Sequence, residues 1–222
     1  MRKTIVLSAL LFLQCAIEND PMDVDIAITN PTPDTPVNTG SNTDTTSTTP
    51  QEFDRSGMLV FWADNIILPA YNQLDTSLIT LSEKVAAFTE SPSATTLSSL
   101  RNQWLAAYSH WQYVEMFDIG LAEEINYKNR INLFPANVTR IENNISGEEY
   151  DLDASSYFTA QGFPALDYLI FGAGENDDAI IALYIASDSN YGNYLAEVTN
   201  KMIDLTLQVK TQWEGDYRDT FV

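Results

Sequence analysis

Two acids, Glu115 and Asp118, are the residues of this sequence best placed to do chemistry, because they follow a tryptophan-rich helical pattern. A projection at about 100° per residue puts both acids within roughly 40° of Trp104, on the apolar face of the expected helix. Burying an unpaired charge is costly, so a carboxylate on that face must be ion-paired, protonated or bound to a cation.

Two interpretations of these acids are compatible with the sequence. In the first, Glu115 forms a salt bridge with a basic residue such as Arg130 or Arg140, or the end of the helix is open to water. In the second, Glu115 and Asp118 belong to a polar pocket at the end of a helix bundle. A third acid, Asp167, lies in the apolar string 162–172 (GFPALDYLIFG), where it is either hydrogen-bonded in the core or part of a pocket.

Histidine and cysteine each occur once, as His110 and Cys15, which limits the chemistry further. These counts exclude an intrachain disulfide, a cysteine-cluster metal site and a two-histidine zinc site. A metal held by carboxylates and other oxygens remains possible. His110 projects to the flank of the apolar face, where a surface or hydrogen-bonding role is expected. The sequence shows neither a nucleophile paired with a histidine base nor a glycine-rich phosphate loop.

The composition sets the broad class of the protein. The chain has 222 residues, with 31 acidic and 11 basic side chains and a formal net charge of −20. This charge repels phosphate backbones, so the composition predicts no nucleic-acid partner. Hydrophobic residues make up 45% of the chain, which is enough for a real core, and the length suits one domain with appendages.

The first fourteen residues have the pattern of an export signal. Arg2 and Lys3 precede an apolar run, Ile5–Leu13, that is too short to span a bilayer as a helix. Cys15 follows where bacterial lipoprotein signals place the lipidated residue. We therefore expect a lipoprotein signal peptide at 1–14 and lipidation of Cys15, the alternative being an ordinary signal peptide.

Residues 15–53 are expected to form a disordered tether, because they are rich in Thr, Pro, Asn and Asp and poor in large apolar groups. The acidic residues Glu18 and Asp20 resemble the surface-export signal of lipoproteins in Bacteroidetes-like bacteria. These features predict an exported protein anchored in the outer membrane by lipid, facing the periplasm or the cell surface.

From residue 54 to the end, apolar residues recur every three or four positions, and no segment alternates with a period of two. This pattern predicts an all-α fold, an up-and-down bundle with one long irregular connection between Gly120 and Gln161. Pro69 is expected to kink or split the first helix. The expected helices cover 58–88, 97–114, 135–145, a segment opened by Gly162-Phe163-Pro164, 177–186 and 191–213.

Three separated runs carry a resemblance to a known family: 104–120 (WLAAYSHWQYVEMFDIG), 132–137 (NLFPAN) and 162–172. Together they resemble the imelysin family, and the likeness extends over about 54–222. The resemblance implies an exported, all-helical bacterial protein, often a lipoprotein, that is associated with iron uptake and grouped with metallopeptidases. Family members usually continue into a further helical half, so we expect 54–222 to be the first half of a longer domain.

The functional motif proposed for the family, G-x-H-x-x-E, is altered here. Gly162 matches the glycine, whereas Pro164 stands in place of the histidine and Asp167 in place of the glutamate. Loss of the histidine removes the best zinc ligand, which argues against peptidase activity.

The resemblance favours a non-catalytic binding or accessory protein of metal acquisition, with iron as the expected metal and iron-uptake proteins as expected partners. Glu115, Asp118 and Asp167 are then the candidate ligands, because oxygen donors suit a hard cation such as ferric iron. The alternatives are a metallopeptidase of the same family and a purely structural or protein-interaction domain.

Overall fold

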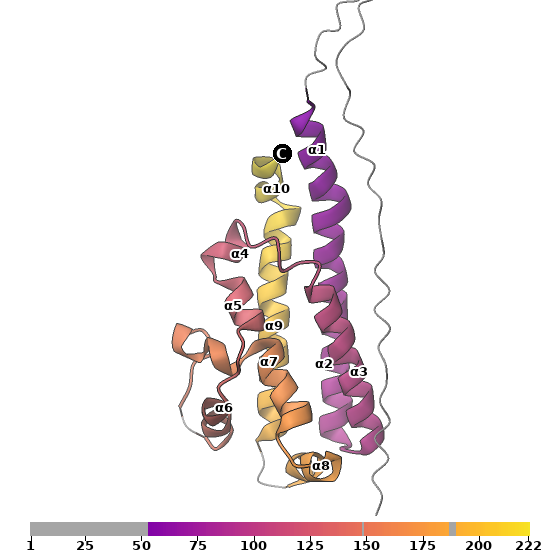
Figure 1. Cartoon of the computed structure of the whole chain (residues 1–222), viewed down its shortest axis with the longest axis vertical. Coiled ribbons are helices and arrows are strands. Elements are labelled where there is room, and N and C mark those ends of the chain that lie inside the picture. The colour runs from indigo at the N-terminus through magenta and orange to yellow at the C-terminus, as the bar shows by residue number, and fades with distance from the viewer. Residues whose placement is uncertain (1–52, 148, 187–189) are drawn as a thin grey trace, which may run out of the picture. The chain divides into compact units, whose positions relative to one another are not determined.

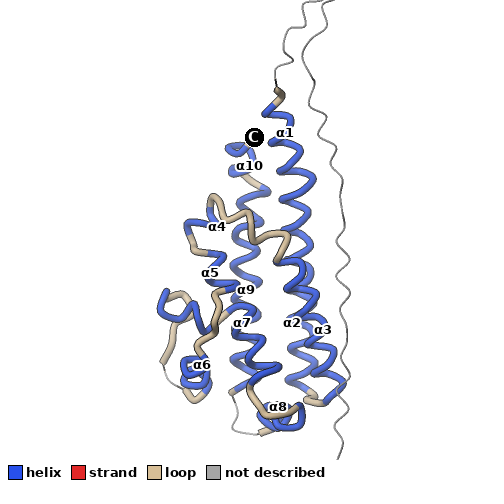
Figure 2. The backbone as a smooth tube through the Cα atoms, viewed as in Figure 1, coloured by secondary structure: helices blue, strands red, loops and turns tan. Residues whose placement is uncertain are grey.

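The computed structural model describes residues 53–147, 149–186 and 190–222, all within one compact unit, Gln51–Val222. The predicted signal peptide, Cys15 and the tether up to residue 52 lie outside the described residues. Within the described ranges every regular element is a helix, which confirms the all-α prediction (Figure 2). None of these helices combines the length and apolar character that a membrane span requires.

The helices of the described residues follow one another with short connections. In chain order they are α1 (Arg55–Trp62), the π-helix η1 (Ala63–Ile67), α2 (Leu68–Glu90), α3 (Ala94–Trp111), α4 (Leu121–Glu124), α5 (Tyr127–Asn132), α6 (Val138–Ile145), the 3₁₀ helix η2 (Ser155–Ala160), α7 (Gly162–Asp167), the π-helix η3 (Tyr168–Gly172), α8 (Asp177–Ile185), α9 (Tyr191–Glu214) and α10 (Asp216–Phe221).

Helices α2, α3 and α9 form the body of the bundle. In Figure 1, α1 and α2 run from top to bottom, α3 returns upward, α7 runs downward, and α9 climbs back to α10. Helix α2 packs along both α3 and α9, and α7 adds to the α9 side. This arrangement confirms the predicted up-and-down bundle.

Local sequence explains why the long helices begin where they do. The Asp54 carboxylate accepts a hydrogen bond of 2.8 Å from the Gly57 amide and caps α1. Ser93 and Thr96 exchange side-chain and backbone hydrogen bonds in a capping box at the start of α3. This cap lies in the gap between the helices predicted at 58–88 and 97–114, which confirms the break between them.

Pro69 acts on the first helix through the π-helical turn η1, which immediately precedes α2. Proline has no amide hydrogen and its ring crowds the carbonyl four residues earlier, here that of Asn65. The wider turn accommodates this conflict without ending the helix. Pro69 therefore distorts the winding of a helix that continues to Glu90.

The π turn also changes which side chains reach the core. The sequence pattern assigns Trp62 and Ile66 to the buried face, but each is 43% exposed, whereas Ala63 and Ile67 are buried. A π turn takes one more residue per hydrogen-bonded ring than an α turn, so the apolar face shifts by one position. After the turn the predicted stripe is correct, with these residues buried: Ala70, Leu74, Leu78, Leu81, Val85 and Phe88.

Helix α3 ends at Trp111, earlier than the projection that placed Glu115 and Asp118 on its apolar face. Beyond it hydrogen bonds to the third residue back appear, Val114 to Trp111 and Phe117 to Val114, both at 2.9 Å, although the Glu115 amide still bonds four residues back, to Trp111. The predicted stripe therefore holds through Val114, which is buried, and Glu115 is half-buried, whereas the change of winding leaves Asp118 exposed.

The segment between Gly120 and Gln161, predicted as an irregular connection that includes one helix at 135–145, contains several short helices. They are α4, α5, α6 and η2. The Asn137 side chain caps α6 by accepting from the Arg140 amide at 3.0 Å, which moves the start of the predicted 135–145 helix to Val138. The helices α4, α5 and η2 are too short to carry a long apolar repeat, so the sequence pattern did not indicate them.

One ion pair is buried between the long helices. The Lys210 ammonium on α9 lies 2.7 Å from the Asp75 carboxylate on α2, and the two side chains are only 17% and 10% exposed. A charge left alone in such a position loses its partner without regaining water. The ion pair therefore requires α2 and α9 to stay packed together, because separating them or removing one partner leaves a buried charge uncompensated.

We predict that Lys210→Met lowers the free energy of unfolding by about 3–5 kcal/mol, because Asp75 is left buried and uncompensated. The double variant Asp75→Leu/Lys210→Met should recover most of that loss. Urea denaturation of wild type, the double variant and both single variants, Lys210→Met and Asp75→Leu, gives the coupling energy. A loss below about 1 kcal/mol in the single variant would show that water reaches Asp75 and that the pair is not important.

Candidate functional site

The three sequence runs of the predicted site come together around one pocket. Its volume is about 470 Å³, and its walls come from α3, from the connection between α5 and α6, and from α7 with η3. The lining residues are Trp104, Tyr108, Asn132, Phe134, Pro135, Ala136, Val138, Phe163, Pro164, Asp167, Tyr168 and Gly172. Residues separated by up to 68 positions in sequence therefore share this cavity, which we call the motif pocket.

Gly162 is the residue that lets α7 reach this position. Its φ angle is +74°, and a Cβ atom added there would lie 2.2 Å from the Ile131 carbonyl oxygen. A larger residue would thus be strained and would also collide with the backbone of α5. The glycine of the motif therefore has a packing role, because it fixes α7 against α5.

Aromatic rings form the inner wall of the motif pocket. Trp104 stacks on Tyr108 with 5.3 Å between ring centroids, and Phe163 meets both rings edge-on at 6.2 and 5.2 Å. The Trp104 indole donates a hydrogen bond of 3.3 Å to the Phe163 carbonyl, which ties α3 to α7. Offset and edge-on contacts of this kind fix the rings in place.

Among the described residues, Asp167 is the only acid that lines the motif pocket. Its side chain remains accessible to solvent and has no hydrogen bond or ion pair with another described residue. Partial burial among apolar groups raises the pKa of Asp167 above its ordinary value of 3.8. An unpaired carboxylate beside aromatic rings is suited to a ligand that carries a positive charge.

Pro164 lies one helical turn before Asp167 and faces the same cavity. The position that the resembled motif gives to histidine therefore does point into the pocket, but proline offers no ligand atom there. A hydrolytic zinc centre needs three protein ligands and an open position. Asp167 supplies one carboxylate, so the described lining does not make up such a set.

The structure does not bring the three predicted ligands together. Glu115 forms an ion pair with Lys128 at 3.3 Å, and Asp118 is exposed in the turn after α3. Neither lines the motif pocket, which contains Asp167. The prediction of a salt bridge for Glu115 is correct in kind, although the partner is Lys128 and not Arg130 or Arg140.

Across the described ranges no group of three or more His, Cys, Asp or Glu side chains is placed to hold a metal ion. The shared ion expected between Glu115, Asp118 and Asp167 therefore lacks the arrangement it requires. His110, expected at the surface or in a hydrogen bond, is half-buried at the end of α3. Its Nδ1 atom has no partner among the described residues.

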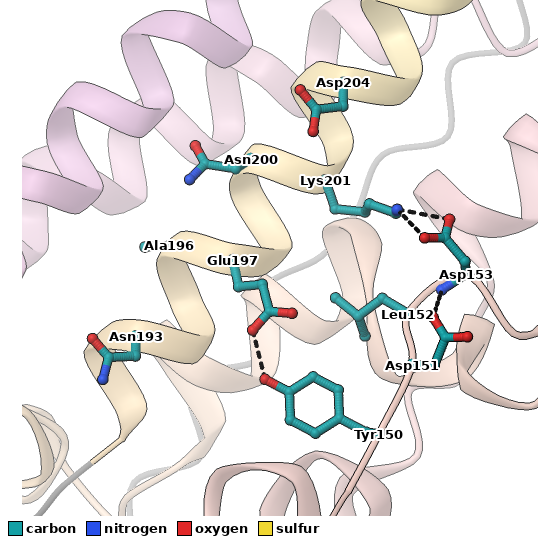
Figure 3. Close-up of a pocket in the computed structure, with 10 residues that line it drawn as sticks. All are labelled: Tyr150, Asp151, Leu152, Asp153, Asn193, Ala196, Glu197, Asn200, Lys201 and Asp204. Carbon is teal, nitrogen blue, oxygen red and sulfur yellow. Dashed lines mark hydrogen bonds and ion pairs between the residues drawn. The ribbon is translucent and has the colours of Figure 1, made fainter.

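A second pocket, of about 540 Å³, lies between α9 and the segment after α6 (Figure 3). Its charged groups other than Asp204 are already engaged: Lys201 pairs with Asp153 at 2.7 Å, Tyr150 donates to Glu197, and Asp151 accepts from the Asp153 amide. Arg130 also binds Asp153, and the two cations hold the pKa of Asp153 below its usual value. These contacts fasten the segment to α9, so we assign this pocket a structural role.

The resembling runs contain four residues that the sequence does not single out as site residues: Trp104, Tyr108, Asn132 and Phe134. Helical spacing alone could not place them, because the residues of the second run lie in a loop. Co-occurrence of the three runs was the available signal, and it points to the motif pocket.

Comparisons with known proteins agree with this geometry. The imelysin family model matches residues 67–222. No curated protein matches the chain. Two solved structures share the fold: a Parabacteroides distasonis protein named as an iron-regulated protein A precursor (22% identity, TM-score 0.59) and an imelysin-like protein from Psychrobacter arcticum (18% identity, TM-score 0.55).

Each of these likenesses covers 71% of this chain, but only 44% of the Parabacteroides chain and 49% of the Psychrobacter chain. The chain thus spans about half the length of the solved structures that it matches. At these identities the likeness establishes the fold alone.

We predict that Gly162→Ala destabilises the protein by about 2–4 kcal/mol, from backbone strain plus the collision with Ile131. Gly147→Ala is the matched control, because Gly147 also has a positive φ angle, +97°, but open space around the added Cβ. It should cost about 1 kcal/mol, from strain alone. Equal losses in thermal or urea unfolding would contradict the packing role of Gly162.

A second prediction concerns the pH dependence of stability. Because the folded state raises the pKa of Asp167, it favours the protonated form, and stability is lost as pH rises above 3.8. Asp167→Asn should therefore raise the melting temperature at pH 7, and the gain should shrink below the ordinary pKa. Asp178→Asn, at an exposed position of α8, is the control and should change little. A lower melting temperature for Asp167→Asn would contradict this account.

Proposed function

Because the chain belongs to the imelysin family, we propose that it is an exported, membrane-anchored binding protein of metal acquisition, with iron as the metal. In this proposal Cys15 carries the lipid anchor and the tether holds the helical domain away from the outer membrane. The protein acts as a non-catalytic component that presents its ligand to iron-uptake proteins.

The observation that carries this proposal is the motif pocket. Its aromatic walls are fixed by ring contacts and by the approach of α7 to α5, while Asp167 stays unpaired inside it. Keeping a carboxylate free in apolar surroundings costs stability, so a binding role accounts for it better than packing does.

Binding is favoured over peptide hydrolysis by the chemistry of the pocket lining. A metallopeptidase needs several metal ligands and a base that activates water. Here Pro164 replaces the motif histidine, and Asp167 is the only carboxylate of the lining. The aromatic surface, by contrast, suits recognition of a metal complex or a partner side chain.

The choice of iron is supported by the name of the Parabacteroides relative, an iron-regulated protein A precursor. The predicted export signal and Cys15 support the location. The net charge of −20 favours the approach of cations to the surface.

A deletion strain of the host bacterium tests the proposal under iron limitation. The full-length wild-type chain should restore growth and cellular iron content. Asp167→Asn and Cys15→Ser should restore them poorly, the first through loss of ligand binding and the second through loss of the anchor. Asp178→Asn is the matched control and should behave as wild type. Full rescue by Asp167→Asn, or a deletion strain that accumulates normal iron, would contradict the proposal.

A further inference from the structure

A second cluster of oxygen atoms lies beside the motif pocket. Glu142 on α6 accepts a hydrogen bond of 2.6 Å from the Tyr168 hydroxyl, at the start of η3. The Tyr191 hydroxyl, at the start of α9, lies 2.8 and 2.7 Å from the two oxygens of the same carboxylate. Three elements of the fold therefore bring two phenols and a carboxylate to one point, which we call the tyrosine–glutamate triad.

The triad holds the Glu142 carboxylate between two neutral phenols, with no cation from the described residues beside it. Glu142, Tyr168 and Tyr191 are all half-buried, and no described basic side chain forms an ion pair with Glu142. Burial and, next, the hydrogen bond to Glu142 raise the pKa of both tyrosines. Without a cation the phenols therefore keep their protons, and the carboxylate depends on neutral donors.

The spacing of these oxygens fits the coordination shell of a small, highly charged ion. Metal–oxygen bonds of roughly 2.0–2.1 Å that meet at right angles place neighbouring ligands about 2.9 Å apart. The hydroxyl–carboxylate distances of the triad, 2.6 to 2.8 Å, need to expand by only a few tenths of an ångström. Phenolate and carboxylate are hard donors, and tyrosine is an established ligand of iron.

We propose that the tyrosine–glutamate triad binds a hard trivalent cation, ferric iron in the context of the proposed function. On binding, each phenol loses its proton to solvent and forms an oxygen–metal bond, so two protons leave for each ion bound. Three negative charges then balance the three positive charges of the ion, and the half-buried complex is neutral. Water or an added anion completes the coordination shell, and no electron is transferred.

The triad is connected to the motif pocket through Tyr168, which lines that pocket while its hydroxyl reaches Glu142. Val138 also lines the pocket, and it lies one helical turn before Glu142 on α6. A metal complex held in the pocket therefore has a short path to the triad. The inference deepens the proposed function by naming the ion and its ligands, and it rests on that function for the choice of iron.

Titration of the full-length protein with ferric nitrilotriacetate tests the triad. A tyrosinate–iron charge-transfer band should appear in the visible spectrum, with release of two protons per ion and tighter binding as pH rises. Tyr168→Phe and Tyr191→Phe should each halve the band and weaken binding at least tenfold. The double variant should abolish the band. Glu142→Gln should weaken binding but keep part of the band, because both tyrosines remain.

Tyr150→Phe is the matched control, because Tyr150 donates to a carboxylate, that of Glu197, as a single phenol. It should keep the full band. Circular dichroism melts separate lost binding from lost folding, since Tyr→Phe keeps the packed ring.

Two results would overturn the inference: no visible band with the wild-type protein, or a band that persists in the folded double variant. The role of the triad would then be to hold α6 against α9. The growth assay with Asp167→Asn is independent of this result, so failure of the triad and failure of the proposed function are distinguishable.

Discussion

The candidate site depends on the close approach of two backbones at Gly162. The Ile131 carbonyl occupies the space where any other residue would place its Cβ atom, and the positive φ angle turns the chain into α7 at that point. From this contact follow the directions of Phe163, Pro164 and Asp167. A change at Gly162 would therefore move the aromatic wall and the acid of the motif pocket together, even though the glycine itself offers no functional group.

The motif pocket combines rigid walls with an unsatisfied acid. Stacked and edge-on rings fix the shape of the cavity, so these side chains lose little conformational entropy when a ligand binds. Asp167 stays unpaired in the same place, whereas the acids Asp75, Asp153 and Glu115 each have a basic partner. Paired acids support the fold, and Asp167, unpaired at the wall of a cavity, is free to take part in recognition.

The sequence was sufficient for the fold class, for the long helices and for the three runs that meet at the pocket. The fold class and the long helices follow from repeated apolar spacing, and the three runs are recognised as short contiguous motifs. The sequence failed where the winding changed after α3, and so it placed Asp118 on the wrong face, whereas Glu115 is half-buried and pairs with Lys128. It also missed the tyrosine–glutamate triad, because Glu142, Tyr168 and Tyr191 are brought together only by tertiary packing.

The π turn before Pro69 separates two phases of a single helix. Trp62 ahead of the turn and Ile66 within it are exposed, whereas beyond the turn the same spacing places apolar residues in the core. The family match starts at residue 67, the last position of this turn. An alignment that continues a regular helical repeat across the turn will therefore assign interior positions to the exposed face. A one-residue deletion within 63–67 would rotate α1 about its axis relative to α2, so that other side chains of α1 face the bundle.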